Sequence, residues 1–193
     1  TWDLTAFWNQ LHNGIANVTI GHGPGSFPDA GFVPAGGLLI RRQNVGDINA
    51  PGLEGDVRYV MDGLTLRAGF DMLDQRVHGG TAAPQLTGKR PAQAPRTTIT
   101  GGFDAPLGNG WELSADAHYE SARYTDDQNT LRLAPAVTVA AKLSWAVSDG
   151  VVLYVSGDNI FNARVATTES GDGVVSYEAP RILCAGVSFK TSP

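Results

Sequence analysis

Apolar and polar residues alternate without interruption from Trp111 to Glu120. Successive side chains of an extended chain lie on opposite faces, so this pattern predicts one β-strand with two unlike faces. One face has no charge, whereas the other carries three carboxylates and a histidine. The uncharged set is Trp111, Leu113, Ala115, Ala117 and Tyr119, and the polar set is Glu112, Ser114, Asp116, His118 and Glu120. Similar alternation resumes at Val137, and a third run begins at Val151.

These alternating runs are about 11 to 15 residues long, whereas strands of soluble proteins usually have about five or six. Long strands with one apolar and one charged face are typical of a wall between lipid and water. The chain has no apolar run near the roughly 20 residues that a membrane-spanning helix needs. The pattern therefore predicts an all-β fold, an antiparallel transmembrane β-barrel.

Short and long connections alternate along the chain. Three tight turns carry Asp-Gly or Asn-Gly pairs, at residues 62–63, 109–110 and 149–150. The long connections that we expect are residues 21–37, 76–95, 123–132 and 162–176. This order gives about eight strands with all tight turns at one end, as in outer-membrane barrels, which have short periplasmic turns and long extracellular loops.

The long connections lack a strand pattern and are rich in Gly, Pro or small polar residues. We therefore expect residues 21–37, 76–94 and 162–176 to be exposed and mobile. The Asn13-Gly14 pair interrupts the first extended segment, from Trp2 to Ile20. We interpret it as a bulge in one bent strand rather than a hairpin turn, because Ile15 to Ile20 alone is short for a wall strand.

Large aromatic residues gather near the expected periplasmic end, on the uncharged faces of their strands. They are Tyr59, Phe103, Trp111, Trp145 and Phe189. An aromatic girdle at the membrane interface predicts this clustering, because amphipathic rings favour the headgroup level. A soluble β-sandwich would scatter its aromatics through a core instead.

Three motifs in this sequence resemble the TonB-dependent outer-membrane receptors. Asn44-Val45-Gly46-Asp47 followed by Gly52-Leu53-Glu54-Gly55 is similar to a family strand in which Gly-x-Glu follows Asn-x-Gly. Asp158-Asn159-Ile160-Phe161-Asn162 is similar to the signature of the penultimate strand. Ala179-Pro180-Arg181 leading into Gly186-Val187-Ser188-Phe189-Lys190 is similar to the closing strand. The motifs stand in family order and spacing, although the family usually ends on the aromatic residue and this chain continues to Pro193.

The resemblance implies that residues 1–193 are the C-terminal third of a 22-stranded type of barrel, with the N-terminal plug domain absent from this chain. It implies a cell outer-membrane location and energy-coupled uptake of a scarce ligand, such as a siderophore or other metal chelate. The implied partners are the lipid bilayer, the rest of the receptor and TonB, which acts through the plug. The substrate itself is not readable from the sequence.

The polar faces of the strands supply the residues that we expect to face the barrel lumen. They are Glu54, Arg58, Arg67, Glu112, Asp116, Glu120 and Lys142. Two alternatives remain open at this stage. One is a small, self-contained eight-stranded outer-membrane barrel with a structural or adhesion role, whose interior is filled by side chains. The other is a soluble β-sandwich that acts as a binding module.

Other site chemistries find little support. A net charge of -5 argues against a nucleic-acid partner. The four histidines are too dispersed for a metal site, and the glycines at 21, 23 and 25 lack the rest of a phosphate loop. Asp126, Asp127 and Asn129 suit calcium, but a polar extracellular turn is the default interpretation. Cys184 is interpreted as an inert interior residue. The sequence therefore predicts no catalytic residues, no cofactor and no enzyme activity.

Overall fold

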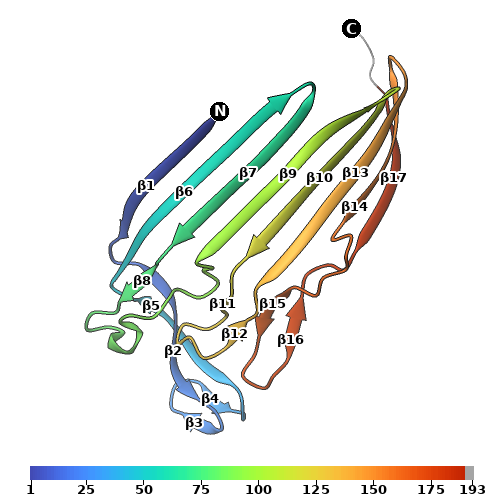
Figure 1. The fold of residues 1–193 in the computed structure, drawn as a ribbon. Helices are drawn as coiled ribbons and strands as arrows, with labels where there is room; N and C mark the ends of the chain where they lie inside the picture. The colour runs from blue at the N-terminus through green and yellow to red at the C-terminus, as the bar shows by residue number, and fades with distance from the viewer. Residues whose placement is uncertain (190–193) are drawn as a thin grey trace.

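The computed structural model describes residues 1–189, which form one large antiparallel sheet with short hairpins at one end (Figure 1). The sheet has the order β1-β6-β7-β9-β10-β13-β14-β17, and the short strand β8 (Arg76–His78) pairs with an extension of β6. The strands are β1 (Trp2–Leu11), β6 (Asp47–Met61), β7 (Leu64–Leu73), β9 (Thr97–Gly108), β10 (Trp111–Glu120), β13 (Ala136–Ser148), β14 (Val151–Asp158) and β17 (Ile182–Phe189). The eight long strands match the predicted number.

Strand register gives the sheet one face without charges. A row across the sheet shows this, because paired residues on neighbouring strands point to the same side. The row runs through Tyr59, Leu66, Phe103, Ala115, Ala141, Gly157 and Leu183. Many large apolar side chains on this face are exposed, including Trp2 at 78% and Leu183 at 70%. A soluble sandwich would cover such a face with a second sheet, so that alternative is wrong.

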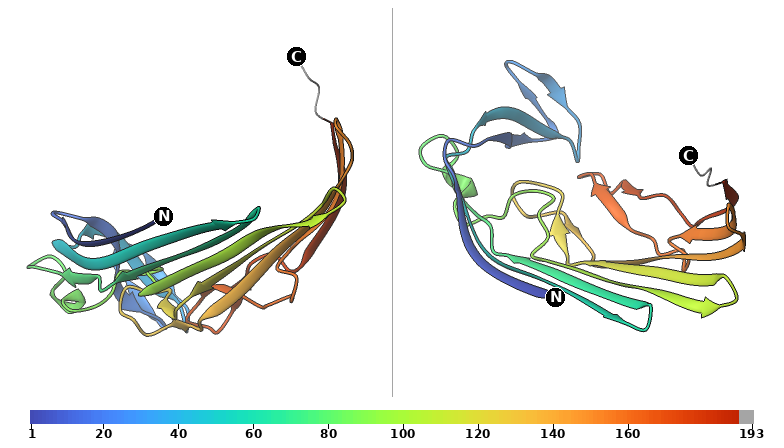
Figure 2. Two further views of the ribbon diagram at one scale, coloured as in Figure 1. Left: turned by 45° about the horizontal axis from the view of Figure 1, so that its top comes forward. Right: turned by 90° about the horizontal axis from the view of Figure 1, so that it is seen from above.

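The sheet is curved but open. Within residues 1–189, β1 pairs only with β6, and β17 pairs only with β14. Figure 2 shows β1 and β17 at opposite edges of the curved sheet. The prediction that the two edges do not pair with each other is confirmed. The small-barrel alternative required that pairing and is therefore wrong.

The tight turns lie together at the end of the sheet that also holds the N-terminus and the end of β17 (Figure 1). At Asp62-Gly63 and Asn109-Gly110 both residues have positive φ, from 49° to 84°. Asn and Gly tolerate this conformation, and such turns match the twist of paired strands. The turn at Asp149-Gly150 instead follows a register shift between Ala146 and Ser148.

The predicted aromatic row occupies the uncharged face near this end. Trp111 and Trp145 are cross-strand partners whose rings stack with centroids 5.3 Å apart. Trp2 was not predicted to join the row, but it pairs with Val57 on the same face. Trp8, near the other end of β1, is also exposed on this face. The distribution fits the predicted girdle.

Short hairpins build the opposite end of the molecule. They comprise β2 (Ile15–His22) with β5 (Leu38–Asn44), β3 (Gly25–Phe27) with β4 (Gly31–Val33), β11 (Arg123–Tyr124) with β12 (Arg132–Leu133), and β15 (Ala166–Glu169) with β16 (Val175–Tyr177). Asn13-Gly14 is no hairpin turn, because β1 and β2 pair in succession with β6 and β5. Backbone bonds from Gly14 to Val45 and Gly46 bridge the interruption.

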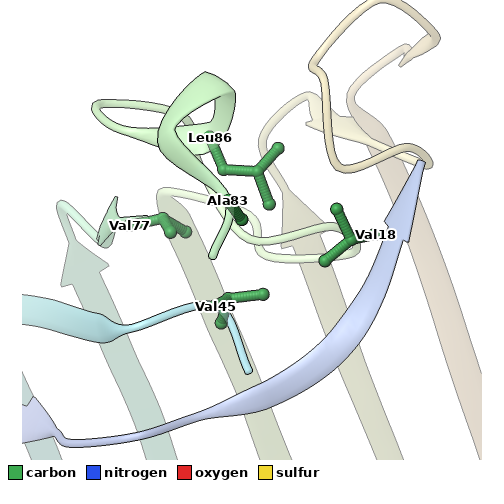
Figure 3. Packing of buried hydrophobic residues seen from close by; sticks show 5 residues of the cluster. All are labelled: Val18, Val45, Val77, Ala83 and Leu86. Carbon is green, nitrogen blue, oxygen red and sulfur yellow. The ribbon is translucent and has the colours of Figure 1, made fainter. Parts of the chain in front are cut away.

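The buried apolar residues of the described chain all lie at this loop end. Val18, Val45, Val77, Ala83 and Leu86 pack together (Figure 3). Ala83 precedes the short 3₁₀ helix η1 (Pro84–Leu86), and Leu86 is its last residue. Both are buried, so the expectation that residues 76–94 are exposed is wrong for the middle of that range. A single-layer wall has no interior, so the loops bury their apolar side chains against one another. No helix in the described chain is long and apolar enough to span a membrane.

Candidate functional site

The polar sides of the strands form a charged face opposite the apolar one. Strand pairing places all seven predicted residues on this face, from Glu54 on β6 to Lys142 on β13. The pleat has a period of two, so one misplaced residue in the register would have moved a whole strand's charges to the other side. Strand pairing therefore brings these seven residues to one face, and the orientation of that face toward a lumen stays a prediction.

Arg67 is the centre of the ion pairs on the charged face. Its guanidinium group on β7 donates to Asp104 on β9 and, through Nη2 at 3.1 Å, to Asp116 on β10. A hollow of about 390 Å³ opens beside this group, lined by residues such as Asp3, Asp56 and Arg58. Asp104 was not among the residues predicted for this face. Alternation in the sequence indicates that Asp104 shares a face with Arg67, but it does not indicate which cationic side chain Asp104 contacts.

A second charged group lies where β10 enters the loops. Glu120 pairs with Arg123, and its carboxylate lies 3.3 Å from Nε2 of His118, from which it accepts a hydrogen bond when that nitrogen carries the proton. The Arg123 Nε also donates to Gln93 Oε1 at 3.0 Å. Gln93 in turn donates to the Thr167 carbonyl at 3.0 Å. The charged face therefore continues into a network that joins three of the long connections.

The loops also contact the first hairpin across long sequence distances. The Asp127 carboxylate accepts from the Thr19 backbone N–H at 2.8 Å and from the Thr19 hydroxyl at 2.6 Å. His22 and Gln128 lie within 3.2 Å through Nε2 and Oε1. Asp127 and Gln128 thus tie β2 to the connection between β11 and β12. Nothing in the local sequence pattern signalled this contact, because its partners are more than 100 residues apart.

Asp126 organises the turn that carries Asp127. Its buried carboxylate accepts from the Thr130 N–H at 2.9 Å, the Thr130 hydroxyl at 2.8 Å and the Leu131 N–H at 2.8 Å. These bonds use the oxygens that a calcium ion would need. Within residues 1–189 no group of three or more His, Cys, Asp or Glu side chains has metal-binding geometry. The arrangement favours the polar-turn interpretation over the calcium interpretation.

Asp126→Ala should open this turn. The backbone N–H groups of Thr130 and Leu131 lose their acceptor, and the free energy of local opening should fall by about 1–3 kcal/mol. Faster deuterium uptake by peptides that cover residues 126–131 of the intact protein would show this. Asp29→Ala, in the exposed turn between β3 and β4, removes the same charge and should leave that uptake unchanged. Equal uptake in both variants would contradict the role given to Asp126.

Acid should have the same effect on the turn. Burial raises the pKa of Asp126, but the hydrogen bonds from Leu131 and Thr130 outweigh it and hold the pKa below its usual value. A group with a lowered pKa in the folded state stabilises that state above its unfolded pKa. The stabilisation is lost as pH falls through the lower value, so protection of the turn should decline below about pH 4.

The sequence motifs have structural roles. Gly46 has φ of 78°, and a Cβ there would lie 2.2 Å from the His78 carbonyl oxygen, while its N–H donates to Asn44 Oδ1 at 2.6 Å. The motif therefore fixes the crossing between β5 and β6. Asn159 exchanges side-chain bonds with the backbone of Ala163, and Asn162 Oδ1 accepts from the Arg181 N–H at 3.0 Å. That motif anchors the return from β14 to β17. Lys190, the last residue of the closing motif, lies outside the described residues.

The chain is similar to known proteins in both sequence and fold. Residues 1–160 match the family model described as TonB dependent receptor-like, beta-barrel. No curated protein matches the chain in sequence. Among solved structures, the siderophore receptor PiuA from Acinetobacter baumannii matches 97% of the chain with a TM-score of 0.74 and 18% identity. The ferric-catecholate import receptor Fiu from K12 E. coli matches 98% with a TM-score of 0.70 and 14% identity.

A third similar structure is the ferric yersiniabactin uptake receptor FyuA from Yersinia pestis. It matches 77% of the chain with a TM-score of 0.68 and 17% identity. The matched part covers 26% of PiuA, 25% of Fiu and 24% of FyuA. The chain thus spans about a quarter of the length of the receptors it matches.

Proposed function

Because the chain belongs to the TonB-dependent receptor-like β-barrel family, we propose that it supplies barrel wall and extracellular loops to an energy-coupled receptor for a scarce ligand such as a siderophore or other metal chelate. The family places the chain in the outer membrane, as the sequence motifs predicted. This proposal includes a plug domain and further barrel strands. It also includes energy that is delivered through TonB.

The observation that carries the proposal is the two-faced open wall. Its apolar face suits lipid, and its charged face suits a water-filled interior. Backbone groups inside a bilayer need partners, so edges such as β1 and β17 need further strands beside them. A wall of this kind is useful as a sector of a wide barrel and has no evident role alone.

We propose that the charged face lines the lumen. There, Glu54, Arg58, Arg67, Glu112, Asp116, Glu120 and Lys142 meet the plug or the passing ligand. Arg67 already has two carboxylate partners, so it mainly fixes the local pattern of charge. Lys142 lies with its Nζ 4.8 Å from the Tyr154 ring centroid and keeps its donors for a partner in the lumen.

The ligand class rests on the similar structures. PiuA is described as a siderophore receptor, Fiu as a ferric-catecholate import receptor and FyuA as a ferric yersiniabactin uptake receptor. These proteins are transport receptors rather than enzymes. We therefore propose transport of a ferric chelate, with no catalytic step by this chain.

Uptake by intact cells tests the proposal. The full-length receptor that contains this chain is expressed in cells without other ferric chelate receptors, and accumulation of ⁵⁵Fe is measured for a panel of ferric siderophores. We expect accumulation of at least one chelate, and its loss when a protonophore collapses the inner-membrane proton gradient. Uptake that persists without the gradient would indicate a passive pore. No accumulation of any chelate above the empty strain would contradict the ligand class.

A further inference from the structure

A cationic hollow of about 760 Å³ lies at the loop end of the wall. Its floor contains residues from the uncharged face of four strands, namely Leu53, Met72, Thr97 and Tyr119, together with Pro51. The hollow also includes Tyr124 and Arg132, which are cross-strand partners on β11 and β12. Their neighbours Arg123 and Leu133 are buried on the other side. The hollow therefore opens on the apolar, outward side of the wall.

Positive charge predominates in this hollow. Arg90, Arg96 and Arg132 line it, and Asp74 is the acidic residue among the lining groups. Asp74 is already shared, since its Oδ1 lies 3.0 Å from Arg76 Nη2 and 3.2 Å from Arg96 Nη2. Within residues 1–189 this carboxylate thus pairs with two guanidinium groups and forms no ion pair with Arg90 or Arg132.

Arg90 has a buried donor without a partner. Its Nη2 atom has no hydrogen-bond acceptor among the described residues and little contact with solvent. Burial, and then the nearby Arg96 and Arg76 charges, lower the pKa of Arg90. Buried guanidinium donors are normally satisfied, and a phosphate oxygen is an acceptor that suits their geometry.

We propose that this hollow binds the phosphate group of an anionic lipid in the leaflet on the loop side of the membrane, with Arg90, Arg96 and Arg132 as its ligands. The position selects a lipid over a soluble anion, because the hollow opens onto the face that contacts the bilayer. Below it the acyl chains continue along Leu53, Met72 and their apolar neighbours. Tyr119 and Tyr124 stand at the level where amphipathic rings favour the headgroups. The inference depends on the outer-membrane placement, not on the proposed ligand uptake.

Lipid retention tests this site directly. The full-length receptor in detergent is incubated with dioleoyl phosphatidic acid or dioleoyl phosphatidylcholine, and bound lipid is counted by native mass spectrometry. We expect clear preference for phosphatidic acid. The double variant Arg90→Gln/Arg96→Gln should bind it at least about tenfold more weakly, as expected for the loss of charge-assisted bonds. The control Arg41→Gln/Arg42→Gln removes the same charge from β5, outside the hollow, and should bind as the wild type does.

Competition with inorganic phosphate distinguishes the two sources of the anion. Inorganic phosphate at millimolar concentration should not displace the lipid, and displacement of the lipid at that concentration would overturn the lipid assignment. Equal retention by wild type and double variant, or equal loss in the β5 control, would overturn the site. If the double variant does not fold, Arg132→Gln replaces it, because the Arg132 side chain is exposed.

Discussion

Leu143→Arg is expected to destabilise the receptor in a bilayer, lowering its free energy of unfolding by about 2–4 kcal/mol. Leu143 lies near the middle of β13, between Leu113 on β10 and Val155 on β14. All three residues belong to the uncharged face. An arginine at this depth loses its hydration to hydrocarbon, and the cost is greatest near the bilayer midplane. Denaturant titration of the full-length receptor refolded into lipid vesicles measures it.

The neighbouring residue supplies a matched control. Ser144 points to the opposite face, where its cross-strand partners are Glu112 and Tyr154. Ser144→Arg introduces the same charge beside a carboxylate in the proposed lumen, so its cost should stay below about 1 kcal/mol. Equal destabilisation by the two substitutions would contradict the assignment of the two faces. A larger cost for Ser144→Arg would reverse it.

The fold was predictable because strand geometry has a short, regular period. Alternation from Trp111 to Glu120 defined two faces, and the Asp-Gly and Asn-Gly pairs at residues 62–63, 109–110 and 149–150 marked where the chain reverses. These are local signals, so no tertiary information was needed. The open edges followed from the family resemblance, since charge alone did not exclude closure of eight strands.

The loop end was not predictable in the same way. Val18, Val77 and Leu86 are separated in sequence and share no periodic pattern, yet they pack together. The contact of Asp127 with Thr19 likewise depends on how two loops fold over the wall. The pair Arg67–Asp104 is an intermediate case. Alternation along each strand predicts that the two side chains share a face, but only the register between β7 and β9 shows that they contact each other.

Backbone geometry of β1 leads to the second large expected effect. Thr1 and Arg58 exchange two backbone hydrogen bonds, with N···O distances of 2.8 and 2.9 Å. Residues in an antiparallel pair alternate between bonding toward the partner and bonding away from it. Thr5 therefore directs its N–H toward β6, whereas the N–H of Ala6 points away from β6. We predict that this outward row is paired in the assembled barrel.

Ala6→Pro should then destabilise the barrel about as much as Thr5→Pro does. Each removes one ladder donor and leaves a carbonyl oxygen without a partner in hydrocarbon, which costs about 2–7 kcal/mol. The comparison isolates the outward bond, because both substitutions place the same ring in the same strand. Refolding titrations of the two full-length variants in lipid vesicles provide the measurement. If Thr5→Pro is costly and Ala6→Pro is nearly neutral, β1 is a bare edge. A bare edge of unpaired backbone groups is not tolerated in a bilayer, so that result would remove the main structural support for a wider barrel.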